Sequence, residues 1–364
     1  MKQIYKDTAL SVFLIIMFIY LLVFPYEIAF HIGNAIKLCL YSVVPSLFMY
    51  ICLANFVTDI ILKKEPKSKA TKFLSDLFAL PEFLVPACIM GLICGAPSGG
   101  ISVCRLYKNG RCTKQEAESA LVLSNNCSAV FITSIAASVL ESKAFAYIIL
   151  FSNIMATITV YFLFFRKNGT RHVSSCVTTK KISVSQTITD SISSSVFSCI
   201  NLCGYIVFFY TLSSVISGKL LFVGCNESFQ ALFKSGVMCF FEMSSGILSC
   251  SMINGNERII AVCSGIAFCG ISIFLQVKSI ADKCGLSSKK FILSKVICAI
   301  VSPLITLALL IILPQKAVSA SYQVVQSKGG IGIGETLSLT IIVCLFIIGW
   351  LVLSYLDKNH KTNS

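Results

Sequence analysis

Two apolar stretches of this chain carry polar and helix-breaking residues that are suited to binding a solute. The first contains a turn sequence with Gly95, Pro97, Ser98, Gly99 and Gly100. Pro97 lacks a backbone donor, and the glycines permit a tight reversal. Free N–H groups around such a turn can receive a carboxylate or a phosphate. The spacing of four between Gly91, Gly95 and Gly99 is also typical of close helix packing, so packing alone is the alternative interpretation.

A polar interruption follows in the next apolar segment, at Ser124, Asn125 and Asn126. Adjacent amides on a helix point to different faces, and polar side chains at membrane depth usually face the interior of a helix bundle. We therefore favour a role in solute binding for these residues. Hydrogen bonding between helices is the alternative.

Glu242 is the only charged residue between Lys234 and Glu257. An ionisable group at membrane depth indicates a functional role, and a desolvated carboxyl group can take up a proton or pair with a coupling cation. A structural hydrogen bond to Ser or Asn is the alternative. Ser245 and Gln276 are the polar residues expected to complete the site from this half of the chain.

A basic link connects the first stretch to the second polar interruption. Arg105 and Lys108 are predicted to form a basic entrance that attracts anions on the cytoplasmic side. Ordinary anchoring by positively charged cytoplasmic loops is an equal alternative. Thr113 and Glu116 have the spacing of a capping box, which predicts a helix that starts at Thr113.

The composition shows what kind of fold must position these residues. The 364 residues are 56% hydrophobic and only 13% charged, with a mean hydropathy of +0.84, whereas a soluble domain has roughly a quarter charged residues. The net charge of +14 is therefore assigned to cytoplasmic loops rather than to nucleic-acid binding. The 18 cysteines and three histidines lack metal-ligand spacing, so neither a metal nor a cofactor is expected.

Apolar segments of about twenty residues, the length that crosses a bilayer, recur along the whole chain. They are 8–26, 38–58, 83–104, 119–140, 144–165, 191–218, 235–256, 259–277, 296–315 and 337–356. The sequence thus predicts a single integral membrane domain over residues 1–364 that is all-α and polytopic. The first segment lacks a convincing cleavage site and is interpreted as a membrane helix.

The distribution of Lys and Arg predicts the topology. If all ten segments cross the membrane, these residues divide almost evenly between the two sides, against the positive-inside rule. If 83–104 and 235–256 instead enter and leave on the same side, every strongly basic link, including 63–72, 105–114, 166–181 and 278–295, faces the cytoplasm. We therefore predict about eight transmembrane helices, two re-entrant hairpins and cytoplasmic termini.

The same topology predicts an internal repeat. A span, a hairpin, a broken span and a further span occur at 38–165 and again at 191–315, with 337–356 as a C-terminal helix. Three true spans in each unit reverse the orientation of the second copy, so the two hairpins enter from opposite sides, as in an inverted-topology repeat.

The motifs also resemble those of the bacterial sporulation integral membrane proteins of the YlbJ type, which carry nucleoside-recognition (Gate) domains. The matching pieces, in the family's order, are Gly95-Ala-Pro97, Glu116-Ala117, Leu123-Ser-Asn-Asn126, Phe241-Glu242-Met-Ser-Ser-Gly246 and Gly270-Ile-Ser272-Ile-Phe274-Leu-Gln276-Val. The resemblance covers roughly residues 38–305. The chain departs from the family's pattern at Ala96, at Ser128-Ala129 and at Phe274.

This resemblance implies an architecture similar to that of concentrative nucleoside carriers. It also implies transport of dipicolinic acid from the mother cell across the outer forespore membrane during sporulation. We therefore expect a carrier of a small organic anion, with dipicolinic acid as the expected solute and a proton or sodium as the undetermined coupling ion. A nucleoside or other small-metabolite carrier, and a non-transporting membrane scaffold for spore assembly, are the alternatives. An enzyme is not expected, and the oligomeric state stays open.

Overall fold

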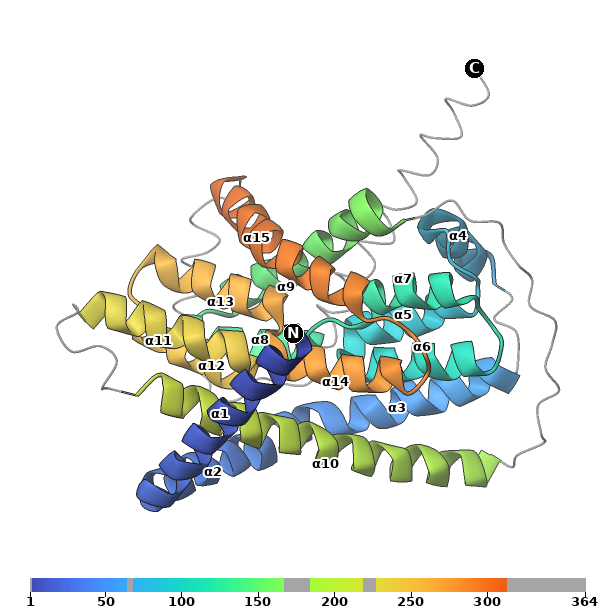
Figure 1. Cartoon of the computed structure of the whole chain (residues 1–364). Coiled ribbons are helices and arrows are strands. Elements are labelled where there is room, and N and C mark those ends of the chain that lie inside the picture. The colour runs from blue at the N-terminus through green and yellow to red at the C-terminus, as the bar shows by residue number, and fades with distance from the viewer. Residues whose placement is uncertain (1, 64–67, 167–183, 219–226, 313–364) are drawn as a thin grey trace.

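The computed structural model describes residues 2–63, 68–166, 184–218 and 227–312, and in these ranges the chain is helical (Figure 1). The N-terminal half contains α1 (Lys2–Val23), α2 (Pro25–Leu38), α3 (Val44–Lys63), α4 (Lys69–Phe78), α5 (Leu84–Cys94), α6 (Ser98–Lys108), α7 (Lys114–Ser124), α8 (Ala129–Leu140) and α9 (Lys143–Val160). The other half contains α10 (Val184–Ile216), α11 (Glu227–Phe241), α12 (Met243–Ser249), α13 (Asn256–Phe268), α14 (Gly270–Asp282) and α15 (Lys289–Ile312).

Six helices in the described ranges are long and apolar enough to cross a membrane. They are Pro25–Asp59, Lys114–Leu140, Lys143–Phe165, Ser185–Ile216, Asn256–Asp282 and Lys289–Ile312. This confirms the prediction of an all-α, multi-pass membrane protein. The expected segment 8–26 lies largely in α1, which is not among the six, and segment 337–356 lies outside the described residues.

The first of the six helices starts earlier than expected. The sequence predicted a boundary at residue 38, but α2 begins at Pro25 and continues through a π-helical turn, Cys39–Val43, into α3. Proline suits the first turn of a helix because its missing N–H has no intrahelical acceptor there. The second boundary that differs is that of the predicted hairpin 235–256, since α11 already begins at Glu227.

Two pairs of shorter helices lie where the hairpins were predicted. The helix α5 packs against α6, and α11 packs against α12. None of these four helices is among the six long ones. The chain reverses at Gly95–Pro97 in the first pair and at Glu242 in the second. We call these pairs the first and second helical hairpins.

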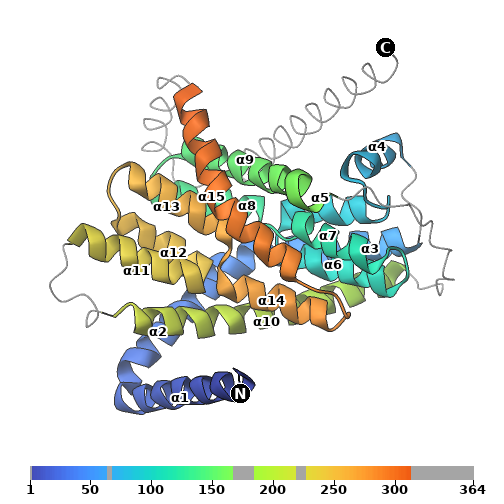
Figure 2. The same ribbon diagram turned by 45° about the horizontal axis from the view of Figure 1, so that its top comes forward.

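Each hairpin is followed by a long helix that is interrupted in its middle. The break between α7 and α8 spans residues 125–128, and the break between α13 and α14 lies at Cys269. Figure 1 shows the first hairpin and α7 on the right and the second hairpin with α8 and α13 on the left. Figure 2 shows the same arrangement from another side, with α14 in the middle of the molecule.

Long helices pack on two sides of the hairpins and broken helices. α3 and α10 pack against each other along one side, and α9 packs against α15 on the other (Figures 1 and 2). The short helix α4 starts with a reciprocal capping box between Ser68 and Thr71. The sequence did not predict this helix, which begins within the basic link 63–72.

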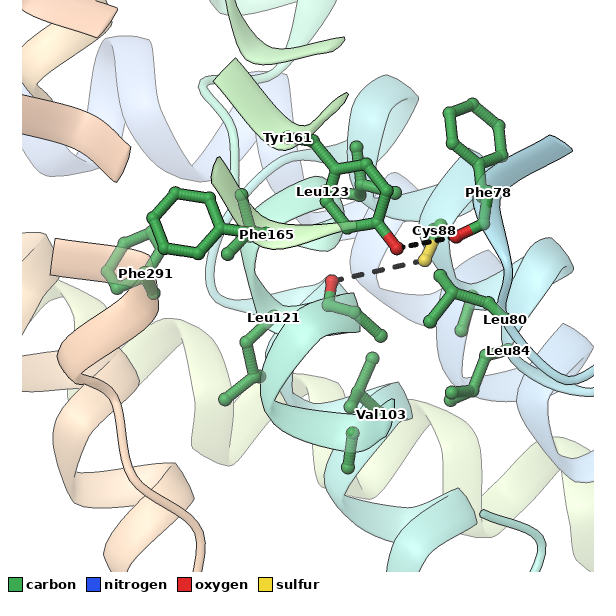
Figure 3. Close-up of a cluster of buried hydrophobic side chains, with 14 of the residues drawn as sticks. Phe78, Leu80, Leu84, Cys88, Val103, Leu121, Leu123, Tyr161, Phe165 and Phe291 are labelled. Atoms are coloured by element: carbon green, nitrogen blue, oxygen red, sulfur yellow. Dashed lines mark hydrogen bonds between the residues drawn. The ribbon is translucent and has the colours of Figure 1, made fainter. Parts of the chain in front are cut away.

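A buried cluster fixes the first hairpin to its neighbours (Figure 3). The Tyr161 hydroxyl donates to the carbonyl of Phe78 at 2.7 Å, and the Phe78 and Tyr161 rings meet edge to face with centroids 5.9 Å apart. The Cys88 thiol points to the carbonyl of Ala120 on α7 at 3.9 Å. This cluster joins α4, α5 and α7 to the end of α9 and so holds the hairpin in place.

Candidate functional site

The tip of the first hairpin is bound directly to the break in the following helix. Gly95 has a φ of 82°, a left-handed conformation that favours glycine, and its carbonyl accepts the hydroxyl of Ser98 at 2.6 Å. The N–H of Ala96 donates to the carbonyl of Asn126 at 2.6 Å. The irregular backbone of the tip is thus paired with the irregular backbone of the break.

Two glycines let the first hairpin approach α7 at backbone distance. A Cβ atom at Gly91 would lie 2.1 Å from the carbonyl oxygen of Ser124, and one at Gly99 would lie 1.8 Å from the same oxygen. Both distances are far below van der Waals contact, so only glycine fits at either position. The packing interpretation of these glycines therefore explains their contacts in this structure.

The two adjacent asparagines point to different partners. Asn125 accepts the N–H of Gly100 through Oδ1 at 3.0 Å and donates through Nδ2 to the carbonyl of Leu121 at 2.9 Å. Its side chain thereby satisfies a donor in the first turn of α6 and a carbonyl in the last turn of α7. Asn125 fastens the hairpin to the broken helix.

Asn126 lies in the break and connects it to two other helices. Its Oδ1 accepts the hydroxyl of Thr157 on α9 at 2.8 Å and the ammonium of Lys295 on α15 at 2.5 Å, and its Nδ2 donates to the carbonyl of Leu123 at 2.7 Å. All three side chains are at most 1–2% exposed. Asn126 thus joins α7, α9 and α15 at the centre of the molecule.

Glu242 lies at the tip of the second hairpin and is 3% exposed. Its two carboxylate oxygens accept the N–H groups of Ser244 at 2.9 Å and Ser245 at 2.7 Å, so Glu242 is the N-cap of α12. A hydrogen bond between Glu242 and a serine was the alternative, structural interpretation of this residue. The two bonds found here are donated by the backbone of the serines. The partial positive charge of the helix start stabilises the carboxylate.

The second break begins at Cys269, with a φ of 71°, and Gly270, with a φ of 82°. Further along α14, Gln276 is 2% exposed and donates to the hydroxyl of Ser272 at 3.3 Å. The Oε1 atom of Gln276 is buried and has no hydrogen-bond partner among the described residues. Gln276 therefore has unused hydrogen-bonding capacity.

A small cavity lies where the two hairpin tips and the two breaks meet. Its volume is about 30 Å³, room for one or two water molecules. Polar and apolar residues of the tips, the first break, α8, α12 and α14 line it, together with apolar residues of the π-helical turn, α3 and α10. The lining residues are Val43, Leu47, Ala96, Asn126, Cys127, Ser128, Phe131, Leu202, Ile206, Glu242, Met243, Ser244, Ser272, Ile273 and Gln276.

Three of the predicted site residues, Asn126, Glu242 and Gln276, line this cavity together. They come from both halves of the chain. The other predicted solute contacts are buried in the walls behind the lining or at the hairpin tips, and they are Gly95, Pro97, Ser98, Gly99, Gly100, Ser124, Asn125 and Ser245.

The predicted basic entrance lies at the other end of α6. Arg105 forms an ion pair with Asp59 at 3.2 Å, and Lys108 is exposed at the end of the helix. Arg105 belongs to a polar seam between α3, α6 and α10 that also contains Asn55, Thr58, Asp59, Ser102, Ser191 and Ser195. Arg105 is therefore engaged in contacts between helices and does not line the cavity.

Several residues of the site were missed by sequence reasoning. Lys295 was counted with the basic link 278–295, but it lies inside α15 and is 1% exposed. Lys295 lies in the middle of the apolar run FILSKVICAI, which could have indicated that it is buried. The small hydroxyl residues Ser128, Ser244 and Ser272 line the cavity without any distinctive sequence signal.

The three departures from the family pattern occupy different environments. Ala96 and Ser128 line the cavity. Phe274 instead packs edge to face against Phe268 and Phe291, with ring centroids 5.0 Å and 5.8 Å away. Ala96 and Ser128 are therefore the positions where a different side chain would change the space available to a solute.

Comparison of the chain with models of protein families, with curated proteins and with solved structures gave no match. The resemblance to the YlbJ-type family therefore stays a prediction, and the functional proposal depends on the site itself.

Proposed function

We propose that this chain is a membrane carrier for a small organic anion, and that dipicolinate is the solute to test first. The observation that carries the proposal is the convergence of two hairpin tips and two helix breaks on one cavity that contains Asn126, Glu242 and Gln276. Interrupted helices expose backbone groups, which is costly in a bilayer unless those groups line a protein cavity. Carriers use such breaks to bind solutes near the membrane midplane.

The start of α14 is the place best suited to a carboxylate. Four helices begin at a tip or break, and three of them have a side-chain acceptor: Asn125 at α6, Ser128 at α8 and Glu242 at α12. In the described part of the chain, α14 begins without a side-chain cap. Its positive dipole end therefore has no side-chain acceptor and would favour an anion, and its residue Ser272 lines the cavity.

The proposed mechanism is alternating access. The cavity has a volume of about 30 Å³, whereas a drug-sized solute occupies a pocket of about 300 Å³ or more. Solute binding then requires the hairpin tips to separate from the walls formed by α3 and α10. The arrangement described here therefore has too little space for the proposed solute.

The proposed topology places the first hairpin in the membrane from the cytoplasmic side and the second from the outside, within an inverted repeat. Its support is the order of a hairpin and a broken helix, α5 to α8, which occurs again in α11 to α14. Chemical labelling tests it. Residues 105–114 should be labelled from the cytoplasm, and labelling from outside would exclude this topology.

A nucleoside is the second candidate solute, because Glu242 is the only acidic or basic side chain among the cavity-lining residues. A neutral, hydrogen-bonding solute would fit such a lining without a compensating positive charge. Purified protein that binds nucleosides and ignores dipicolinate would favour this candidate.

The direct test is uptake of labelled dipicolinate by lipid vesicles that contain only this protein. We expect uptake above that of protein-free vesicles and its loss in Asn126→Ala. Lack of uptake by the wild-type protein would refute the proposal for this solute. If Asn125, Asn126 and Glu242 can all be replaced without loss of function in cells, a scaffold role is favoured instead.

The cellular part of the proposal is transport from the mother cell across the outer forespore membrane. It is supported by the resemblance described above. Sporulating cells that carry Glu242→Gln should accumulate less dipicolinate than wild-type cells. Unchanged accumulation would remove Glu242 from the mechanism.

A further inference from the structure

Lys295 is a fully buried cation that the proposed solute site does not explain. It lies in α15, is 1% exposed, and donates to Asn126 Oδ1 at 2.5 Å. Its ammonium also lies 5.9 Å from the centre of the Phe291 ring. It is not among the residues that line the cavity, so it is placed behind Asn126.

The charge of Lys295 has no acidic partner among the described residues. None of the ion pairs found there includes it. A buried charge is costly unless it is compensated by hydrogen bonds or by opposite charge. One neutral amide oxygen, which also accepts the hydroxyl of Thr157, compensates only part of that cost.

Lys295 also lies near the two helix breaks. Cys127 and Cys269, one in each break, both lie within electrostatic range of the Lys295 ammonium. These breaks follow the C-terminal ends of α7 at Ser124 and of α13 at Phe268. Helix C-termini carry partial negative charge and free carbonyl groups, which stabilise a cation.

In carriers with broken helices, half-helix C-terminal ends and unwound carbonyls are the groups that coordinate a coupling cation. We propose that the Lys295 ammonium is a tethered cation that occupies such a position, so that this carrier needs no free sodium or other alkali cation. The inference rests on the proposed carrier function. Of the two coupling ions left open above, it excludes sodium. It also brings a positive charge to the side of Asn126 that faces away from the cavity.

The first test measures cation binding without transport. Thermal unfolding of the purified full chain in detergent is compared in sodium, potassium and choline chloride at equal ionic strength. We expect the wild-type midpoint to be the same in all three salts. In Lys295→Ala, Asn126 Oδ1 and the nearby helix ends lose their cation, so sodium should raise the midpoint by several degrees relative to choline.

Lys289→Ala is the matched control, since Lys289 is exposed near the start of the same helix. It should show no dependence on the cation, and neither should Lys295→Arg, which keeps the charge. A wild-type protein that sodium specifically stabilises would overturn the proposal. So would a Lys295→Ala protein that responds to salts like the Lys289→Ala control. The wild-type measurement decides even if Lys295→Ala does not fold.

The second test measures uptake into vesicles with sodium or choline outside. Wild-type uptake should differ by less than twofold between the salts, and Lys295→Ala should be at least tenfold slower in choline and partly restored by sodium. A sodium requirement of the wild type would refute the tethered cation. If the wild type transports neither dipicolinate nor a nucleoside in any salt, the proposed function fails while the unfolding test still decides the role of Lys295.

Discussion

Replacement of Gly99 by alanine should loosen the first hairpin from the broken helix. The added Cβ would lie 1.8 Å from the carbonyl oxygen of Ser124 and 2.9 Å from the Cα of Gly91. Both atoms are backbone, so α6 must move away from α7 by more than an ångström. Overpacking of this kind costs about 3 kcal/mol, and the better helix propensity of alanine offsets about 1 kcal/mol. The net loss should be about 2 kcal/mol.

Thermal unfolding in detergent measures this effect, with Gly204→Ala as the control. Gly204 lies inside α10 and has no atom within 4 Å of the position that its Cβ would take. We expect Gly99→Ala to lower the midpoint by roughly 4 °C or more and Gly204→Ala to leave it unchanged or slightly raised. Equal midpoints for the two variants would refute the close approach of the hairpin to Ser124.

Three further predictions concern single contacts. Glu242→Gln replaces one of the two acceptors at the start of α12 by a donor, so the midpoint of unfolding should fall by the equivalent of about 1 kcal/mol; an unchanged midpoint would contradict the capping role. Tyr161→Phe removes the hydrogen bond to the Phe78 carbonyl and should destabilise the chain by about 1 kcal/mol in the same assay, which a neutral result would exclude. Arg105→Ala should slow dipicolinate uptake more at low than at high ionic strength, because salt screens the attraction of anions, whereas an effect independent of salt would argue against a basic entrance.

The sequence predicts the interruptions of the helices better than their boundaries. Glycine, proline and adjacent amides in an apolar segment leave a strong signal of a helix break, and in this structure the chain reverses at Gly95 and breaks after Ser124. The start of α2 at Pro25 was missed, because an apolar run does not reveal where one helix ends and the next begins.

The composition of the site was only partly predictable from the chain. Asn126, Glu242 and Gln276 are polar residues in apolar surroundings, and these three line the cavity. Asn125 is an equally conspicuous polar residue in the sequence, but its side chain accepts the N–H of Gly100 instead of lining the cavity. The direction of a side chain at a helix break depends on tertiary contacts, which the sequence does not show. Lys295 follows a basic link, so charge counting assigns it to the loop although its helix has already begun at Lys289.

The two buried charges near the cavity each lie at a helix end of opposite partial charge. Glu242 caps the positive start of α12, and Lys295 lies by the breaks that follow the negative ends of α7 and α13. Each charge is thereby stabilised without the other. The start of α14 is left with a partial positive charge and no side-chain cap. This helix start is therefore where we expect an anion to bind, even though the only charged side chain in the lining is a carboxylate.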